Sequence, residues 1–169
     1  DRYCLDFLSL FSVGEGLLVG SSADAMFLVH SETVPSTFVP TRPFRVNAGS
    51  PHAYVMMADG NTRYMAELTA GDELLAVDQK GNGRSVVLGR LKIEQRPMLK
   101  IVGKKHTKTH QNANTCHVFM QQAETVRLIT GDSTAVSVTA LEKGQPVLGW
   151  EGHAARHVGR PVKGGVEER

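Results

Sequence analysis

The sequence has few cysteines and no long apolar run, and each of these absences excludes a class of protein. With only Cys4 and Cys116, the chain has no disulfide framework and no Cys-x-x-Cys pair, so a reducing compartment is expected. The longest apolar stretches are four or five residues, as in Ala25–Val29, too short for a helix that crosses a bilayer. The chain begins at Asp1 without a basic and apolar leader, which suggests a fragment whose targeting segment, if any, lies outside it.

Charge and composition narrow the class further. The 169 residues carry 19 Lys and Arg against 17 Asp and Glu, and this net charge of +2 is too small for a protein that binds nucleic acid over its whole surface. Hydrophobic residues make up 41% and charged residues 21%, which excludes a disordered tail and a coiled coil. The length fits one domain or two small ones. The sequence also lacks the Gly-x-Gly-x-x-Gly fingerprint, the phosphate-binding loop and the Gly-x-Ser-x-Gly elbow of common enzymes.

Short runs of apolar and β-branched residues between Gly, Pro and Asx turns predict a mainly β fold, an antiparallel barrel or sandwich. Two turns, Asp59–Asn61 and Lys80–Gly83, are typical of hairpins. Short helices are predicted only over Arg63–Leu68 and His153–Val158. The predicted strands are Tyr3–Leu10, Gly16–Gly20, Met26–His30, Phe44–Asn47, His52–Met57, Thr62–Met65, Glu73–Asp78, Arg84–Ile93, Met98–Val102, His117–Gln121, Thr125–Ile129, Val136–Val138 and Pro146–Trp150.

The organisation along the chain suggests two small β subdomains. Residues 1–67 form a β region that carries the polar motifs, and residues 68–169 form a barrel-like region. Within the second region, residues 103–117 break the apolar pattern and are predicted to be an exposed loop, because they carry too little apolar area to pack.

Polar side chains interrupt the strand pattern in two places and suggest a site for an anionic substrate. An apolar strand ends in His30 and Glu32, and the segment Arg42–Gly49 is followed by His52 and Tyr54. The planar guanidinium of arginine matches a carboxylate, and histidine exchanges protons near neutral pH. The sequence leaves open the alternative that each arginine pairs with a nearby glutamate and each histidine caps a strand end.

The alternation of side chains sharpens this expectation. In a strand that follows Pro43, the side chains of Arg45 and Asn47 point to the same face, away from the core. A short turn then brings His52 back toward that face. We expect Arg45, Asn47 and His52 to converge in one concave site, with His30 and Glu32 approaching from a neighbouring strand end.

Metal and phosphate sites have weaker support. His153 and His157 have the spacing of ligands on a helix but lack a third ligand, and the lysines near residue 104 are typical of a solvated face. The irregular spacing of the other candidates favours a solvated loop, so no metal site is predicted; these candidates are His106, His110, Cys116 and His117.

Several motifs together resemble one family. They occur in family order across nearly the whole chain and include Gly14–Ser21, Phe27–Glu32, Arg42–Gly49, Gly89–Pro97 and Gln122–Leu128. In these motifs the sequence is similar to the archaeal-type 3-dehydroquinate synthase family, and it corresponds to the C-terminal half of its members. The missing N-terminal half is therefore an expected partner.

The resemblance implies an NAD-dependent oxidative deamination of a seven-carbon amino-keto sugar acid, followed by ring closure to 3-dehydroquinate in the shikimate pathway of aromatic amino acid biosynthesis. NAD is expected from the family alone, and its binding residues stay unassigned because no dinucleotide fingerprint is present. Chemical type suggests the site residues: His30, His52 and Glu32 as catalytic groups, and Arg42, Arg45, Asn47 and Tyr54 as groups that bind the substrate.

The chain also departs from the family pattern. At Ser22–Asp24 it carries a negative charge where members usually have a positive one. The alternative function is therefore a non-catalytic homologue that serves as a structural or assembly subunit of a larger complex. The modest charge content fits a mesophilic organism, and a plastid homologue from a photosynthetic eukaryote is the expected source; otherwise the cytoplasm is the expected location.

Overall fold

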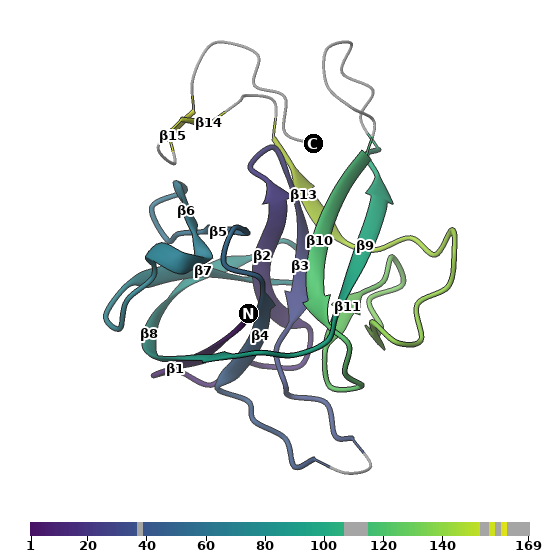
Figure 1. The fold of residues 1–169 in the computed structure, drawn as a ribbon, viewed down its shortest axis with the longest axis horizontal. Helices are drawn as coiled ribbons and strands as arrows, with labels where there is room; N and C mark the ends of the chain where they lie inside the picture. The colour runs from purple at the N-terminus through teal and green to yellow at the C-terminus, as the bar shows by residue number, and fades with distance from the viewer. Residues whose placement is uncertain (37–38, 107–114, 153–155, 158–159, 162–169) are drawn as a thin grey trace.

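The computed structural model describes residues 1–36, 39–106, 115–152, 156–157 and 160–161. In the described part of the chain there is no α-helix, so the predicted mainly β fold is confirmed (Figure 1). The same part contains no helix long and apolar enough to cross a membrane. The elements are β1 (Arg2–Phe7), β2 (Glu15–Ser22), β3 (Ala25–His30), β4 (Arg45–Gly49), β5 (Tyr54–Met56), β6 (Thr62–Tyr64), the 3-10 helix η1 (Met65–Glu67), β7 (Glu73–Asp78), β8 (Gly83–Glu94), β9 (Met98–Lys104), β10 (Thr115–Gln121), β11 (Arg127–Ile129), β12 (Ala135–Ser137), β13 (Gly149–Glu151), β14 (Arg156–His157) and β15 (Arg160–Pro161).

Eleven strands form one curled antiparallel sheet. Its main path runs β12-β11-β3-β2-β7-β8-β1-β4, with β13 joined to β3 and the β5–β6 hairpin joined to β2. A separate two-stranded sheet, the β9–β10 hairpin, lies against it, and β10 contacts β2, β3 and β4 (Figure 1). The large sheet therefore curls as a half-barrel, and the hairpin covers its open side.

The core lies between the curled sheet and the hairpin. Val46 of β4 and Val118 and Met120 of β10 are fully buried in it, together with the inward side chains of β1 and β2. Leu18 and Leu28 point to the other face of the sheet and belong to a second, smaller apolar cluster. The central strands β2 and β3 are thus apolar on both faces, which explains their nearly continuous hydrophobic runs.

Both hairpin turns predicted from the sequence are confirmed. Asp59–Asn61 joins β5 to β6, with Gly60 at a φ of 81° and the Asn61 amide donating to the Asp59 carboxylate at 2.9 Å. Lys80–Gly83 joins β7 to β8, with Gly81 at a φ of 87°. Left-handed backbone of this kind is what glycine supplies in tight turns.

Three local elements differ from the sequence-based predictions: one loop and two helices. The large sheet also crosses the proposed division between 1–67 and 68–169, because β7 and β8 lie between β2 and β1. The predicted loop 103–117 is shorter, since its first two residues belong to β9 and its last three to β10; residues 107–114 lie outside the described part. Of the predicted helix His153–Val158, the described residues Arg156–His157 form a strand, and the predicted helix Arg63–Leu68 is only the three-residue η1.

Candidate functional site

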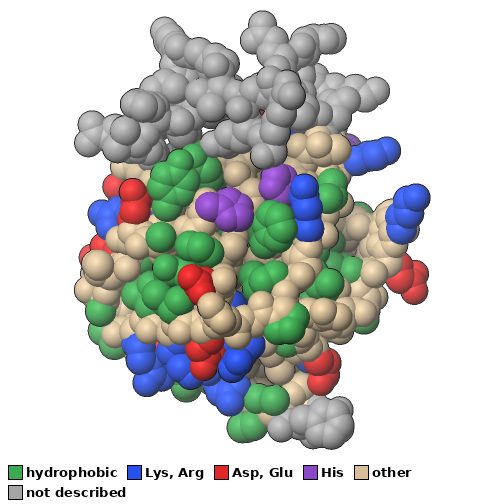
Figure 2. Space-filling model, in the orientation of Figure 1, with side chains coloured by type: hydrophobic (Ala, Val, Ile, Leu, Met, Phe, Trp, Pro, Cys, Tyr) green, Lys and Arg blue, Asp and Glu red, His purple; other side chains and the backbone are tan. Residues whose placement is uncertain are grey.

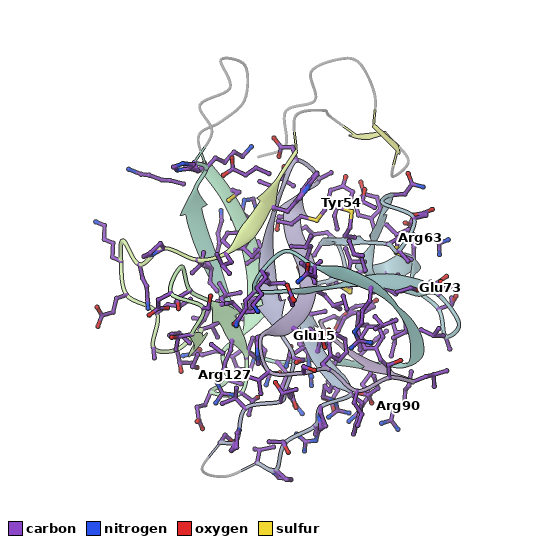
Figure 3. The ribbon with its side chains drawn as sticks, turned by 180° about the vertical axis from the view of Figure 1, so that it is seen from behind. Glu15, Tyr54, Arg63, Glu73, Arg90 and Arg127 are labelled. Carbon is purple, nitrogen blue, oxygen red and sulfur yellow. The ribbon has the colours of Figure 1, made fainter. Side chains whose placement is uncertain are left out.

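The seven predicted site residues do not form one cluster. His30 is buried in the interior, a group of arginines and carboxylates gathers at the start of β4, and His52 lies beyond the end of β4. Arg90 belongs to the arginine group, and Tyr54 follows His52 by two residues. Figure 3 shows Arg90 and Tyr54 at opposite ends of the domain. The expected convergence on a single site is therefore wrong, and each group has its own physical explanation.

His30 lies in the interior and serves as a hydrogen-bond acceptor. Its side chain is 2% exposed, and its Nε2 accepts the backbone N–H of Gly14 at 2.9 Å. Burial, with a smaller contribution from the charge of Arg127, lowers the pKa of His30 to about 4, so the ring is neutral at physiological pH. His30 is also far from His52. His30 pairs with Gly16 at the start of β2, whereas His52 contacts Ser21 near the end of β2, and these two positions are about 16 Å apart along an extended strand.

The arginine predicted to hold a substrate carboxylate instead holds a carboxylate of the domain itself. Arg45 donates to Asp6 from Nε at 2.6 Å and from Nη2 at 2.8 Å, and Arg90 donates to the same carboxylate at 2.8 Å. The two side chains meet because Asp6 of β1 and Arg45 of β4 are cross-strand partners. Burial alone raises the pKa of Asp6, but the hydrogen bonds and charges of Arg45 and Arg90 outweigh it and hold that pKa below its usual value.

A second ion pair continues this cluster. Arg42 and Glu32 face each other across an isolated β-bridge, with Arg42 Nη1 3.3 Å from Glu32 Oε2. The Glu32 amide donates to the Arg45 carbonyl at 2.8 Å, which ties the two pairs together. For Arg42, Arg45 and Glu32, the structure thus shows the ion pairing that was the alternative interpretation, and their side chains anchor β1, β4 and the segment after β3.

His52, in contrast, is exposed and held in place. Its Nε2 is 3.0 Å from Ser21 Oγ and its Nδ1 is 3.2 Å from Ser50 Oγ, so both ring nitrogens are oriented by serine hydroxyls. The ring also meets the edge of Phe119 in a T-shaped contact with centroids 5.6 Å apart. An exposed imidazole with a fixed orientation is suited to proton transfer.

The outward face of β10 lies beside His52. His117 packs edge-on against the other side of Phe119 at 5.7 Å, and the Lys100 ammonium lies 5.9 Å from the centre of the same ring. Asn47 joins β4 to this face, donating from Nδ2 to Gln121 Oε1 at 2.7 Å. We call the group formed by His52, His117, Phe119, Lys100, Asn47 and Gln121 the histidine surface; histidine side chains lie together with hydrophobic and basic ones on the face in Figure 2.

The electrostatics of the histidine surface favour an anion. Partial burial lowers the pKa of His117, and the nearby Lys100 and His52 lower it further because each adds positive charge. Among the described residues, no carboxylate forms an ion pair with Lys100. The surface therefore combines a lysine cation, two imidazoles and amide groups.

The sequence-based prediction named His52 and Asn47 among the residues of the histidine surface, but it did not name Lys100, His117 or Phe119 as site residues. A signal was present, because residues 117, 119 and 121 alternate with the buried Val118 and Met120 and so share one face of a strand. What the sequence did not show is that this face adjoins His52. Tyr54 lies nearby on β5 and its hydroxyl bonds that of Tyr64 at 2.7 Å.

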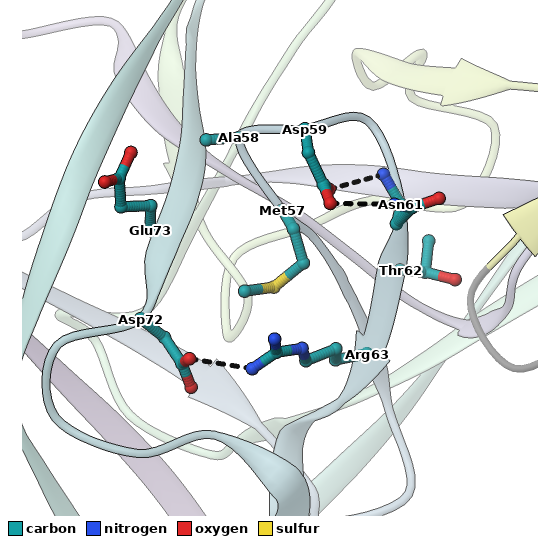
Figure 4. Close-up of a pocket in the computed structure, with 8 residues that line it drawn as sticks. All are labelled: Met57, Ala58, Asp59, Asn61, Thr62, Arg63, Asp72 and Glu73. Carbon is teal, nitrogen blue, oxygen red and sulfur yellow. Dashed lines mark hydrogen bonds and ion pairs between the residues drawn. The ribbon is translucent and has the colours of Figure 1, made fainter.

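A polar pocket of about 490 Å³ lies beside the β5–β6 hairpin but contains none of the predicted site residues (Figure 4). Its charges are satisfied within the pocket: Arg63 pairs with Asp72 at 2.7 Å, and Asp59 accepts from Asn61. These bonds stabilise the β5–β6 turn and the segment before β7. Arg63, the one cation among the described residues that line the pocket, is therefore already paired with a carboxylate. Among the described residues, no group of three or more His, Cys, Asp or Glu side chains is close enough to hold a metal ion. The candidates His110 and His153 lie outside the described residues.

The described residues do not fit the cofactor that the resemblance implies. A dinucleotide pyrophosphate is typically held by a glycine-rich turn and the N-terminus of a following helix. The described part of the chain has neither, since its one helical element is the three-residue η1. We therefore assign these residues no chemical step that involves NAD.

Comparison with known proteins identifies the family. The model of the 3-dehydroquinate synthase II C-terminal domain matches residues 1–169. The chain is 45% identical to the 3-dehydroquinate synthase of Methanosphaera stadtmanae over all 169 residues, which are 45% of that protein. It is 46% identical to a 3-dehydroquinate synthase homolog of Persephonella marina, again over its whole length and 49% of the relative, and 43% identical to the 3-dehydroquinate synthase of Methanocaldococcus jannaschii, covering 45% of it.

The chain thus spans about half the length of the curated relatives it matches. These relatives are archaeal and bacterial, so the expected plastid origin finds no support among them. No solved structure matches. The family model and the identity along the full chain agree with the motifs read from the sequence, and the chain belongs to the 3-dehydroquinate synthase II family as its C-terminal domain.

Proposed function

We propose that this domain contributes the histidine surface to the active site of a 3-dehydroquinate synthase. The full-length protein would carry out the NAD-dependent oxidative deamination of an amino-keto sugar acid and its cyclisation to 3-dehydroquinate. The observation that carries the proposal is the exposed His52, oriented by Ser21 and Ser50 and packed against Phe119, the ring that the Lys100 ammonium also contacts. Family membership supplies the reaction, and this geometry supplies the groups that suit an anionic substrate.

Ring closure is the step for which the domain offers suitable groups. The imidazole of His52 takes a proton from the carbon beside the substrate ketone, and the electron pair of that C–H bond forms the new C–C bond to the second carbonyl carbon. The π electron pair of that second carbonyl moves to its oxygen, which takes the proton back from His52 and becomes a hydroxyl. The Lys100 ammonium binds the substrate carboxylate, and the Gln121 amide orients a hydroxyl or carbonyl oxygen. His117, with its lowered pKa, is a neutral donor at the rim of the same surface.

Hydride transfer to NAD is assigned to the other half of the full-length protein. The described residues lack a cradle for a dinucleotide, whereas the relatives have as much chain again outside the match. On this proposal the histidine surface faces the N-terminal half across the substrate. The two halves would then each supply part of one site.

Turnover of the full-length protein tests the proposal. The protein is incubated with the amino-keto sugar acid and NAD, and NADH is followed by its absorbance. His52→Gln should lower kcat by about 10²- to 10⁴-fold, the usual contribution of a general acid–base group, with an unchanged circular dichroism spectrum. The matched control is His106→Gln, because His106 is exposed and lies outside the histidine surface. Equal kcat for both variants and the unaltered protein would contradict the role of His52.

A non-catalytic subunit is the second candidate, and one observation favours it. The arginines and the glutamate whose chemical type suggested a role at the site are occupied by ion pairs within the domain. The relatives from Persephonella marina and Aquifex aeolicus are themselves named homologs of the synthase. Copurification of the full-length protein in a stable complex, with no binding of NAD in calorimetry, would favour this candidate over the enzyme.

A further inference from the structure

The loop between β1 and β2 exposes three large aliphatic side chains within six residues. Leu8 is 75% exposed, Leu10 is 67% exposed and Val13 is 72% exposed. Only three other large hydrophobic side chains of the described residues are exposed, and they are dispersed over β6, β8 and β9. Single exposed aliphatic residues are ordinary, but a cluster of this kind on one loop is typical of a contact surface. We call Leu8, Leu10 and Val13 the aliphatic patch.

The backbone of this loop is fixed to the rest of the domain. The Leu8 amide donates to the Val87 carbonyl at 3.0 Å, and the Phe11 amide donates to the Pro43 carbonyl at 2.6 Å. The Gly14 amide donates to the buried His30 ring at 2.9 Å. These bonds tie the loop to β8, to the segment before β4 and to β3, so the patch is held in one conformation rather than free to fold inward.

The fourth large apolar side chain of the loop, Phe11, is buried and holds the loop in place. Its ring packs edge-on against Phe7 at 5.3 Å and is covered by the Arg84 guanidinium at 5.6 Å. Arg84 also donates to the Leu10 carbonyl at 2.8 Å and pairs with Glu15 at 2.8 Å. Phe11 anchors the loop from below, and this anchoring points Leu10 and Val13 outward.

We propose that the aliphatic patch is the surface on which this domain packs against the N-terminal domain of the full-length protein. The relatives extend over about twice this chain, and the occupant proposed for the patch is the domain that corresponds to their N-terminal half. An ordered, preformed apolar patch lowers the entropic cost of such a contact.

The residues around the aliphatic patch indicate which chemistry the facing surface should have. Arg84 borders the patch, because its guanidinium donates to the Leu10 carbonyl. The Arg84 side chain is 38% exposed although it is ion-paired with Glu15. Apolar centres with arginine at the rim are common in protein interfaces. The facing surface of the N-terminal domain should therefore be apolar, with carboxylates or carbonyl oxygens around it.

Hydroxyl-radical footprinting of the full-length protein tests the proposal directly. The oxidation rate of each side chain is read by mass spectrometry and divided by its rate in the urea-unfolded protein. The expected oxidation rate of the aliphatic patch, relative to the unfolded protein, is at least about fivefold lower than the exposed fractions of Leu8, Leu10 and Val13 in this domain would give. This reduction should be the same at every protein concentration. Oxidation at the rate set by those fractions overturns the proposal. Protection that appears only at high concentration also overturns it, because the occupant is then a second copy.

A pair of variants provides the second measurement. Leu10→Ser removes apolar area from the patch, and this exposed position contributes little to the fold of the domain itself. Ile93→Ser, at a residue that is 53% exposed and lies outside both the patch and the histidine surface, is the matched control. In calorimetry of the full-length protein, the patch variant should split or lower the unfolding transition while the control leaves it unchanged. Identical transitions for both variants contradict the proposal. Neither measurement involves turnover, so an inactive protein would still show the contact.

Discussion

Removal of the Asp6 carboxylate should destabilise the protein far more than removal of the exposed arginine that shares it. The Asp6 side chain is 7% exposed and accepts two hydrogen bonds from Arg45, whose side chain is 11% exposed. Asp6→Ala leaves the Arg45 guanidinium buried without its partner, and breaking a buried pair in this way costs about 3–5 kcal/mol. Arg90→Ala removes a side chain that is 62% exposed and leaves the Asp6–Arg45 pair intact, so it should cost about 0–1 kcal/mol.

The assay is urea unfolding at pH 7, followed by circular dichroism and by the fluorescence of Trp150, the one tryptophan of the chain. The pH dependence supplies a second check. Because the arginines hold the pKa of Asp6 below 3.8, its contribution is complete above the unfolded pKa of about 3.9 and declines as the pH falls toward the lower folded value. The difference between Asp6→Ala and the unaltered protein should therefore narrow below about pH 4.

The result that would refute this reasoning is a stability loss for Asp6→Ala within 1 kcal/mol of that for Arg90→Ala. Arg45 would then not depend on Asp6, and its guanidinium would be available to a substrate carboxylate. A large difference instead means that Arg45 is a structural residue of the β1–β4 contact.

Two further predictions concern His30 and Gly49. Since burial lowers the pKa of His30 from 6.5 to about 4, the protein should lose up to about 3 kcal/mol of stability as the pH falls through that window, and His30→Gln should abolish this loss in urea unfolding at a series of pH values. Gly49→Ala should cost clearly more than Gly60→Ala by the same assay. Both glycines have positive φ, but only at Gly49 would the new Cβ meet an atom, the Phe119 carbonyl oxygen at 2.6 Å; equal losses would show that this close approach is relaxed.

The strands could be predicted from the sequence because their signal is local. Alternation and turn residues lie within a few positions of each other, as at Asp59–Asn61, and most predicted strands appear in the structure. The order of the strands is not local. Nothing in the sequence shows that β7 and β8 insert between β2 and β1, so that the large sheet crosses the proposed boundary at residue 67.

The site was predicted only in part for the same physical reason. The alternation in β4 gave the correct common face for Arg45 and Asn47, but the partner of Arg45 is Asp6, which the sheet brings next to it from β1. His30 could have been placed in the interior from the sequence, since it directly follows the uninterrupted apolar run Ala25–Val29, which is typical of a strand buried on both faces. The link between His52 and Phe119 depends on how β10 lies beside β4, a contact between segments far apart in sequence.

The closure of the half-barrel has a consequence for how this family can diversify. Within the described residues no backbone ladder joins β4 to β10, and the two strands are held together by side chains such as Val118 and Met120. The separation of His52 from His117 therefore depends on the volume of interior residues, not on a fixed strand register. Conservative exchanges of those interior residues can widen or narrow the histidine surface while every strand pairing stays the same. On the role proposed for this surface, substrate size could then be tuned from the interior of the half-barrel without altering a residue that touches the substrate.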